Sequence, residues 1–133
     1  MKMTCIFDLQ DTLISKSGKL LVNVKKLSKI LNKYCESSSL YTINEPWTLN
    51  QLAANPDLAV VFKNIYLVNT KIIQDAVWLQ QPVSSKTLVI GDGKESELAF
   101  AKILKIPSLD VNKVTTDLTE ALEDRLMELC NGY

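Results

Sequence analysis

Short apolar runs alternate along this chain with segments of helical spacing, and this alternation constrains the fold more than any other feature. The apolar runs that favour strands are residues 4–7, 40–43, 65–68, 87–90 and 107–111. The segments that favour helices are residues 23–35, 47–54, 70–80, 95–104 and 118–129. Strands that alternate with helices form a parallel sheet with helices on both faces. We therefore predict a three-layer α/β domain built on a five-stranded parallel sheet.

Other segments refine this prediction. Residues 58–62 are as β-prone as residues 65–68, and the second run is the better candidate for a core strand. Residues 13–21 place two apolar arms around a Lys-Ser-Gly-Lys turn, which predicts a small hairpin. The last helix gains an apolar face from leucines three and four residues apart, at Leu118, Leu122, Leu126 and Leu129.

Composition limits the chemistry and the partners. The 133 residues include no histidine, which excludes Ser-His-Asp and Cys-His catalysis and a histidine-ligated zinc site within this chain. Fifteen basic and fifteen acidic residues cancel, so the charge indicates neither a nucleic-acid nor a membrane partner. No apolar run approaches the ~20 residues of a membrane span, and the first one is too short for a signal peptide. Three cysteines without a CxxC pair favour a reducing, cytoplasmic location.

Two acids each follow a predicted strand. Asp8 ends the run at residues 4–7, and Asp92 follows the run at residues 87–90. The carboxyl ends of parallel strands lie at the same edge of a sheet, where such sheets bind ligands. Two carboxylates there, with nearby backbone carbonyls, suit Mg²⁺, which prefers oxygen ligands. The sequence therefore predicts a Mg²⁺ site at this edge.

Hydroxyls and a lysine are expected at the same edge. Thr12, Thr42 and Lys71 all fall at predicted strand ends or helix starts. A lysine and hydroxyls beside a metal ion would bind an anionic substrate such as a phosphate ester.

These residues resemble the motifs of the haloacid dehalogenase-like superfamily. The segment Asp8-Leu9-Gln10-Asp11-Thr12-Leu13 is similar to its first motif, DxDxT. Gly91-Asp92, with Glu97 five residues after Asp92, is similar to its fourth motif. Thr42 and Lys71 occur in order between them, where the second and third motifs have a hydroxyl and a lysine. The resemblance implies that residues 1–133 form a single Rossmann-like domain of this kind.

The resemblance also implies roles. Asp8 would attack a phosphoryl group to form an aspartyl-phosphate, and it would bind Mg²⁺ together with Asp92. Gln10 would bind Mg²⁺ through its backbone carbonyl, and Glu97 would orient the waters of the metal. Thr42 and Lys71 would hold the phosphoryl oxygens, with Asp11 and Thr12 as further candidates in the same loop.

The family often inserts a cap domain, and neither usual interval has room for one here. The hairpin at residues 13–21 would be the small flap that is left. Capless members resemble enzymes for bulky or macromolecular phosphate esters, since nothing closes over the site. The implied partner is a phosphorylated substrate; the sequence is silent on oligomeric state.

Two positions depart from the family pattern. Gln10 stands where the family's hydrolases have a general acid/base aspartate, and an amide cannot exchange a proton at neutral pH. Asp11 is a possible substitute for that acid. Ser96 stands four residues after Asp92, where the commoner spacing has an acid, with Glu97 and Glu95 as the alternatives.

Three functions stay open on these residues. The first is a slow Mg²⁺-dependent phosphohydrolase or phosphotransferase. The second is a catalytically impaired binding or regulatory module with the same fold. The third is a chain that is phosphorylated on Asp8 and retains the phosphate, as a receiver would.

Overall fold

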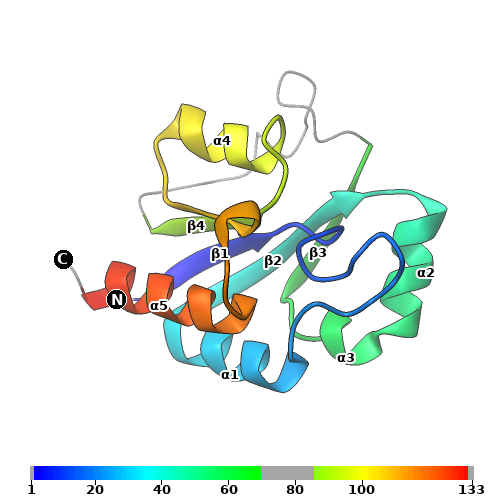
Figure 1. The fold of residues 1–133 in the computed structure, drawn as a ribbon, viewed down its shortest axis with the longest axis horizontal. Coiled ribbons are helices and arrows are strands. Elements are labelled where there is room, and N and C mark those ends of the chain that lie inside the picture. Colours follow the sequence, from blue (N-terminus) through cyan, green and yellow to red (C-terminus); the bar gives the residue numbers. More distant parts are fainter. Residues whose placement is uncertain (1, 70–85, 132–133) are drawn as a thin grey trace.

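A computed structural model describes residues 2–69 and 86–131. Five strands form one parallel sheet in the order β3-β2-β1-β4-β5 (Figure 1). The strands are β1 (Met3–Phe7), β2 (Cys35–Ile43), β3 (Asn64–Val68), β4 (Thr87–Gly91) and β5 (Ser108–Asp110). The helices are α1 (Val24–Tyr34), α2 (Pro46–Ala54), α3 (Pro56–Ala59), α4 (Glu97–Leu104) and α5 (Leu118–Asn131), with a 3₁₀ turn at Val111–Lys113.

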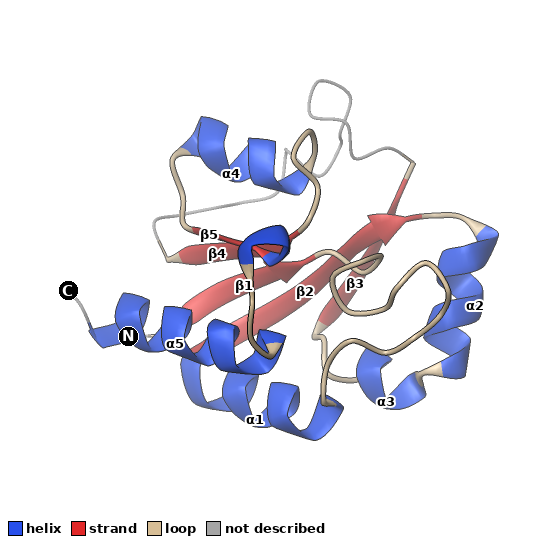
Figure 2. Ribbon diagram, in the orientation of Figure 1, coloured by secondary structure: helices blue, strands red, loops and turns tan. Residues whose placement is uncertain are grey.

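Helices cover both faces of the sheet, as Figure 2 shows, with α4 on one side and α1 and α5 on the other. The larger core lies under α1 and α5 and contains Met3, Cys5 and Phe7 of β1. Ile6 of the same strand points to the smaller core, where it joins Phe100 of α4. Successive residues of a strand face opposite sides of the sheet, and both faces of β1 are covered, which is why every residue of β1 except Thr4 is apolar.

The central strand is paired so that the two acid-bearing strand ends lie next to each other. β1 pairs with β4 in parallel register from Thr4 opposite Thr87 to Phe7 opposite Ile90. The backbone N–H of Asp8 continues this pairing by donating to the carbonyl of Ile90 at 3.0 Å. The order of connection reverses at β1, because the chain moves from β1 to β2 and β3 and later returns to β4 and β5. Crevices at such a reversal are the usual ligand sites of open α/β sheets.

The predicted five-stranded parallel sheet with helices on both faces is confirmed. The four leucines expected on one face of the last helix are all buried. The predicted helix at residues 70–80 lies outside the described residues.

The structure corrects the start of β2 and decides between the two β-prone runs in favour of residues 65–68, which lie in β3. β2 begins at Cys35 rather than near residue 40, because its polar start pairs with β1 and is buried there: Ser38 and Ser39 are each 7% exposed. The β-prone run at residues 58–62 is not a strand. Pro56 begins the short helix α3 there, since proline favours the first turn of a helix, and Leu58 is fully buried.

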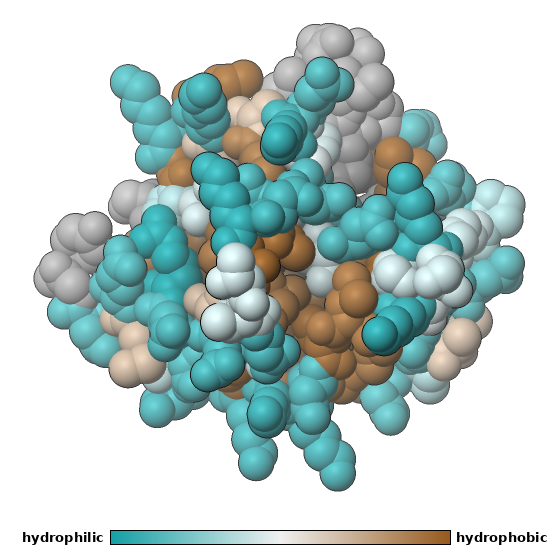
Figure 3. All heavy atoms as spheres, viewed as in Figure 1, coloured by the Kyte–Doolittle hydropathy of each residue, from teal (hydrophilic) through white to brown (hydrophobic). Residues whose placement is uncertain are grey.

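The loop between β1 and α1 forms the predicted hairpin in compact form. Ile14 bridges Gln10 in parallel and Leu20 in antiparallel fashion, and the N–H of Leu21 donates to the carbonyl of Leu13 at 2.8 Å. An apolar area near the centre of Figure 3 lies over this loop. Leu20 and Leu21, both on the loop, are each 38% exposed.

Candidate active site

Asp8 lies at the carboxyl end of the central strand, where it is 8% exposed. The hydroxyl of Thr12, itself fully buried, donates to Oδ2 of Asp8 at 3.1 Å. The same hydroxyl lies 3.5 Å from Oδ1 of Asp92. Thr12 therefore links the two carboxylates and fixes the position of Asp8.

The turn from β4 into α4 brings a third acid to the same place. Glu97 is the first residue of α4 and is 3% exposed. Its Oε2 accepts the backbone N–H of Gly93 at 2.7 Å, and its Oε1 accepts the hydroxyl of Ser96 at 2.7 Å. A Cβ at Gly91 would lie 2.3 Å from Oε2 of Glu97, so only glycine fits against this side chain. The glycines allow the Glu97 carboxylate to fold back over the turn.

Three carboxylates meet at this edge of the sheet. Each of Asp8, Asp92 and Glu97 offers an oxygen, and these atoms all lie within 4.8 Å of one another. Like charges at this separation repel, and a divalent cation among them offsets the repulsion. Carboxylate oxygens are the ligands that Mg²⁺ and Ca²⁺ prefer, so the donor set suits a hard divalent cation.

Asn112 holds the Asp92 turn from the far side. Its Nδ2 donates to the backbone carbonyl of Asp92 at 3.0 Å and to Oδ1 of Asp110 at 3.1 Å. The contact joins segments that are 20 positions apart in sequence. No motif in the sequence marks Asn112, so the sequence does not predict this contact.

The three acids open into a cavity of about 270 Å³. The residues that line it are Asp8, Gln10, Asp11, Lys16, Thr42, Ile43, Glu45, Asp92, Gly93, Ser96 and Glu97. Five of these carry carboxylates, whereas Lys16 alone carries a positive charge among the described lining residues. The described lining is therefore strongly acidic. It attracts cations, and an anionic ligand would be repelled unless a bound cation offsets this charge.

Most of the residues predicted from the sequence lie on this cavity. Thr42 is 3% exposed, and its hydroxyl lies 3.5 Å from that of Thr48. Gln10 lines the cavity beside Asp8. Thr12 is not among the lining residues, because its hydroxyl is engaged with the carboxylates behind the wall. Lys71 lies outside the described residues.

Asp11 has a structural contact in the loop. Its φ of 60° lies in the left-handed region, which aspartate tolerates better than most residues. Its Oδ1 accepts the backbone N–H of Lys16 at 3.1 Å. Asp11 thus lines the cavity, and one of its carboxylate oxygens accepts a hydrogen bond from within the same loop.

The chain has a Rossmann-like α/β fold with an acidic cavity at the carboxyl edge of its parallel sheet. This fold is shared with a solved structure described as "NMR structure of the core domain of, a putative phosphoglycolate phosphatase from Streptococcus pneumoniae TIGR4". The two chains align over 96% of each, with a TM-score of 0.59 and 18% sequence identity. No protein-family model and no curated protein matches the sequence. Among the described helices, none has the length and apolar character needed to cross a membrane.

Proposed function

We propose that this protein is a Mg²⁺-dependent phosphohydrolase or phosphotransferase that acts through an aspartyl-phosphate on Asp8. The observation that carries the proposal is the meeting of Asp8, Asp92 and Glu97 within 4.8 Å at a cavity that Thr42 also lines. The shared fold supports it, since the neighbour is described as a putative phosphoglycolate phosphatase.

In this proposal the metal site consists of Asp8, Asp92, Glu97 and the backbone carbonyl of Gln10. Bound Mg²⁺ would neutralise phosphoryl oxygens and so lower the repulsion between an anionic ester and the acidic wall. Ser96 and Gly93 hold both oxygens of Glu97, which leaves that carboxylate suited to orient the waters of a metal.

The chemistry divides into two displacements. A carboxylate oxygen of Asp8 attacks phosphorus, the bond from phosphorus to the alcohol oxygen breaks, and the alcohol leaves with that electron pair and takes a proton. Water, or an acceptor alcohol in a transferase, then attacks phosphorus, loses a proton and restores the Asp8 carboxylate. Thr42 and, from the sequence, Lys71 would bind the phosphoryl oxygens.

Gln10 makes the turnover slow. The leaving alcohol needs a proton, and an amide side chain supplies none at neutral pH. The absence of a general acid/base typically lowers rates by about 10²–10⁴-fold. The proton would come from solvent or from Asp11. One carboxylate oxygen of Asp11 accepts the backbone N–H of Lys16.

A catalytically impaired binding or regulatory module is the second candidate function. Gln10 favours it, because the residue lies on the cavity where an acid/base would be needed. The site could then bind a metal ion and a phosphorylated partner without turnover.

The proposal extends to the whole chain. We propose that residues 1–133 form one domain without a cap and that the protein is cytoplasmic. We also propose that its substrate is a bulky phosphorylated molecule. Its phosphoryl group would enter the site beside the loop at residues 8–23, and the rest of the molecule would stay outside.

The first test is hydrolysis of generic phosphate esters with and without Mg²⁺. We expect slow activity that requires Mg²⁺ and that is lost in Asp8→Asn. The matched control is Asp124→Asn, which removes an exposed carboxylate from α5 and should leave the rate unchanged. Equal rates in the parent protein and Asp8→Asn would contradict the nucleophile assignment.

A further inference from the structure

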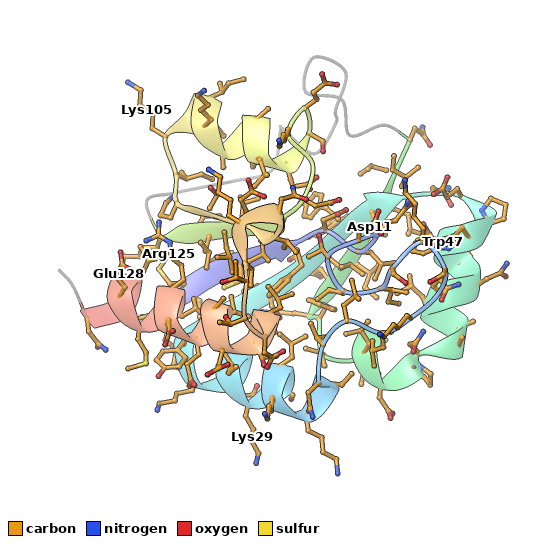
Figure 4. All side chains as sticks on the ribbon, in the orientation of Figure 1. Asp11, Lys29, Trp47, Lys105, Arg125 and Glu128 are labelled. Atoms are coloured by element: carbon orange, nitrogen blue, oxygen red, sulfur yellow. The ribbon has the colours of Figure 1, made fainter. Side chains whose placement is uncertain are left out.

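Lys16 is held at the cavity by contacts on both sides of its backbone. Its N–H donates to Oδ1 of Asp11 at 3.1 Å, and its carbonyl accepts the indole N–H of Trp47 at 3.1 Å. Trp47 belongs to α2, so the loop is tied to the helix that follows Thr42 in sequence. Figure 4 marks Asp11 on the loop and Trp47 on this helix.

The residues that follow Lys16 form a tight turn that keeps the loop in place. The N–H of Ser15 donates to the carbonyl of Lys19 at 2.8 Å, and the N–H of Lys19 donates to Oγ of Ser15 at 3.0 Å. Gly18 has a φ of 90°, and a Cβ there would lie 3.4 Å from the Gln51 side chain of α2. The position of Lys16 is therefore set before any ligand arrives, which lowers the entropic cost of using it.

Lys16 lines a cavity whose other described charged residues are all acidic. It is the one positive charge among the described residues that line the cavity, against five carboxylates. Its Nζ makes no hydrogen bond or ion pair with any described residue. A lysine offers three donors on a flexible stem, so this group can adapt to an anion that enters the cavity.

The exposure of Lys16 separates it from the phosphoryl position. Asp8 and Thr42 are buried at the strand ends, whereas Lys16 is exposed and comes from the loop at the rim. A phosphoryl group on Asp8 would occupy the inner part of the cavity. The outer part of the same ligand would then lie within reach of Lys16.

We propose that Lys16 determines specificity by binding a second anionic group of the substrate, beyond the transferred phosphoryl group. This inference rests on the proposed function and narrows it to phosphate esters that carry a further carboxylate or phosphate. Trp47 and Asp11 position Lys16 through its backbone.

The test compares phosphonates that differ only in the far end. With Mg²⁺ present, the affinities of propylphosphonate, 3-phosphonopropionate and propane-1,3-diphosphonate are measured by calorimetry. We expect the protein to bind at least one of the two ligands that carry an anionic group at each end more tightly than propylphosphonate, by about three- to ten-fold, as a charged hydrogen bond at an exposed site supplies. The carboxylate and diphosphonate arms identify which group is preferred.

Variants assign that preference to Lys16. Lys16→Met should abolish the preference and leave the affinity for propylphosphonate within about two-fold, and Lys16→Arg should retain part of it. Lys19→Met is the matched control, since Lys19 is exposed on the same loop and does not line the cavity. The inference is overturned if the parent protein shows no preference for either ligand or if Lys16→Met keeps it. The binding readout is independent of turnover, so failure to hydrolyse any ester would count against the proposed function alone.

Discussion

At the residue scale, Gln10 decides between the two candidate functions. It lines the cavity beside Asp8, and its backbone bridges Ile14 at the start of the hairpin. A carboxylate at the same position would meet the same cavity and could exchange a proton with a leaving group. Under the proposed function, the site would lack one group of a hydrolase site, because an amide stands where an acid is needed.

The substitution Gln10→Asp tests this directly. We expect Mg²⁺-dependent hydrolysis to rise by about ten-fold or more, because general acid/base help typically supplies about 10²–10⁴-fold and the new aspartate should recover at least part of it. Steady-state rates with a phosphate ester measure the effect. Asn50→Asp on α2 adds the same charge at an exposed position outside the cavity and serves as the control. Absence of activity in both the parent and Gln10→Asp would favour the binding module.

Some residues of the site are predictable from the sequence and others are not. Asp8 and Asp92 could be predicted because each follows a clear strand, and parallel strands end at one edge. Asn112 and Lys16 could not, since their contacts with Asp92 and Trp47 join segments that no local pattern relates. Such contacts depend on where β5 and α2 pack, which is a property of the whole fold.

At the element scale, the turn from β4 to α4 is shaped by the space that glycine leaves. The sequence predicts a helix from residue 95, and α4 begins at Glu97 instead. The backbone N–H groups of Ser96 and Leu98 both donate to the carbonyl of Gly93, which closes the turn before the helix starts. Because α4 starts two residues later than predicted, the Glu97 carboxylate lies over the turn rather than on the solvent side of α4.

Gly91→Ala is expected to damage this turn. The new Cβ would lie 2.3 Å from Oε2 and 2.4 Å from Cγ of Glu97, so the side chain must move. We expect the free energy of unfolding to fall by about 1–3 kcal/mol, as overpacking does, and Mg²⁺ affinity to fall with it. Denaturant unfolding and calorimetric Mg²⁺ titration measure the two effects.

Gly18→Ala is the control that separates a general loss of stability from a specific loss of metal binding. Gly18 has a positive φ, so alanine there also lowers stability, but the nearest atoms to its new Cβ belong to Gln51 and not to Glu97. Mg²⁺ affinity should be unchanged in this control. An unchanged Mg²⁺ affinity in Gly91→Ala would show that Glu97 does not contribute to the metal site.

The sequence predicts an element best where its local pattern and its burial agree. The run Thr87-Leu88-Val89-Ile90 is buried on both faces, and its sequence predicts this. The sequence does not predict the start of β2, because its serines are not among the β-branched and aromatic residues that favour strands; this segment pairs with the central strand. The secondary structure of residues 58–62 is ambiguous from the sequence. Their apolar side chains suit a strand, whereas Pro56 just before them favours the first turn of a helix.

At the scale of the whole molecule, ionisable groups in the central strands link stability to pH. Cys5 of β1 has a pKa well above its ordinary value of 9.0, because of a hydrogen bond with the Cys35 thiol and because of burial. The two sulfur atoms lie 2.7 Å apart. Burial, with a smaller contribution from Tyr66, also raises the pKa of Tyr41 on β2 above its ordinary value of 10.0.

Raised pKa values predict a loss of stability in alkali. Cys5 and Tyr41 make their full contribution to stability below the pKa values that they have in the unfolded state, where both side chains are neutral. This contribution is lost as pH rises through their pKa values in the folded state. Urea unfolding should show the free energy of unfolding falling above about pH 9, by at most about 1.4 kcal/mol per pH unit for each group. Cys5→Ser and Tyr41→Phe should each make the fall shallower.

Cys130→Ser is the comparison variant, because Cys130 on α5 makes the smallest of the contributions that raise the pKa of Cys5. The pH dependence should change far less in this variant than in Cys5→Ser. A free energy of unfolding that is constant from pH 8 to pH 10.5 would contradict the prediction.

The architecture of the whole molecule followed from the alternation of strands and helices, since a parallel sheet needs a crossover between its strands. The order β3-β2-β1-β4-β5 puts β1 at the centre and so brings Asp8 beside Asp92. The acidic cavity is a product of that order, as its wall combines the ends of β1, β2 and β4 with the loop at residues 8–23.

The central claim is that Asp8 accepts a phosphoryl group beside a bound Mg²⁺. It is tested most directly with beryllofluoride, a mimic of an aspartyl-phosphate, monitored by ¹⁹F NMR. The account predicts a protein-bound fluoride signal that requires Mg²⁺, persists in Asp124→Asn and is absent in Asp8→Asn. Absence of a bound signal in the parent protein, or its persistence in Asp8→Asn, would contradict the account.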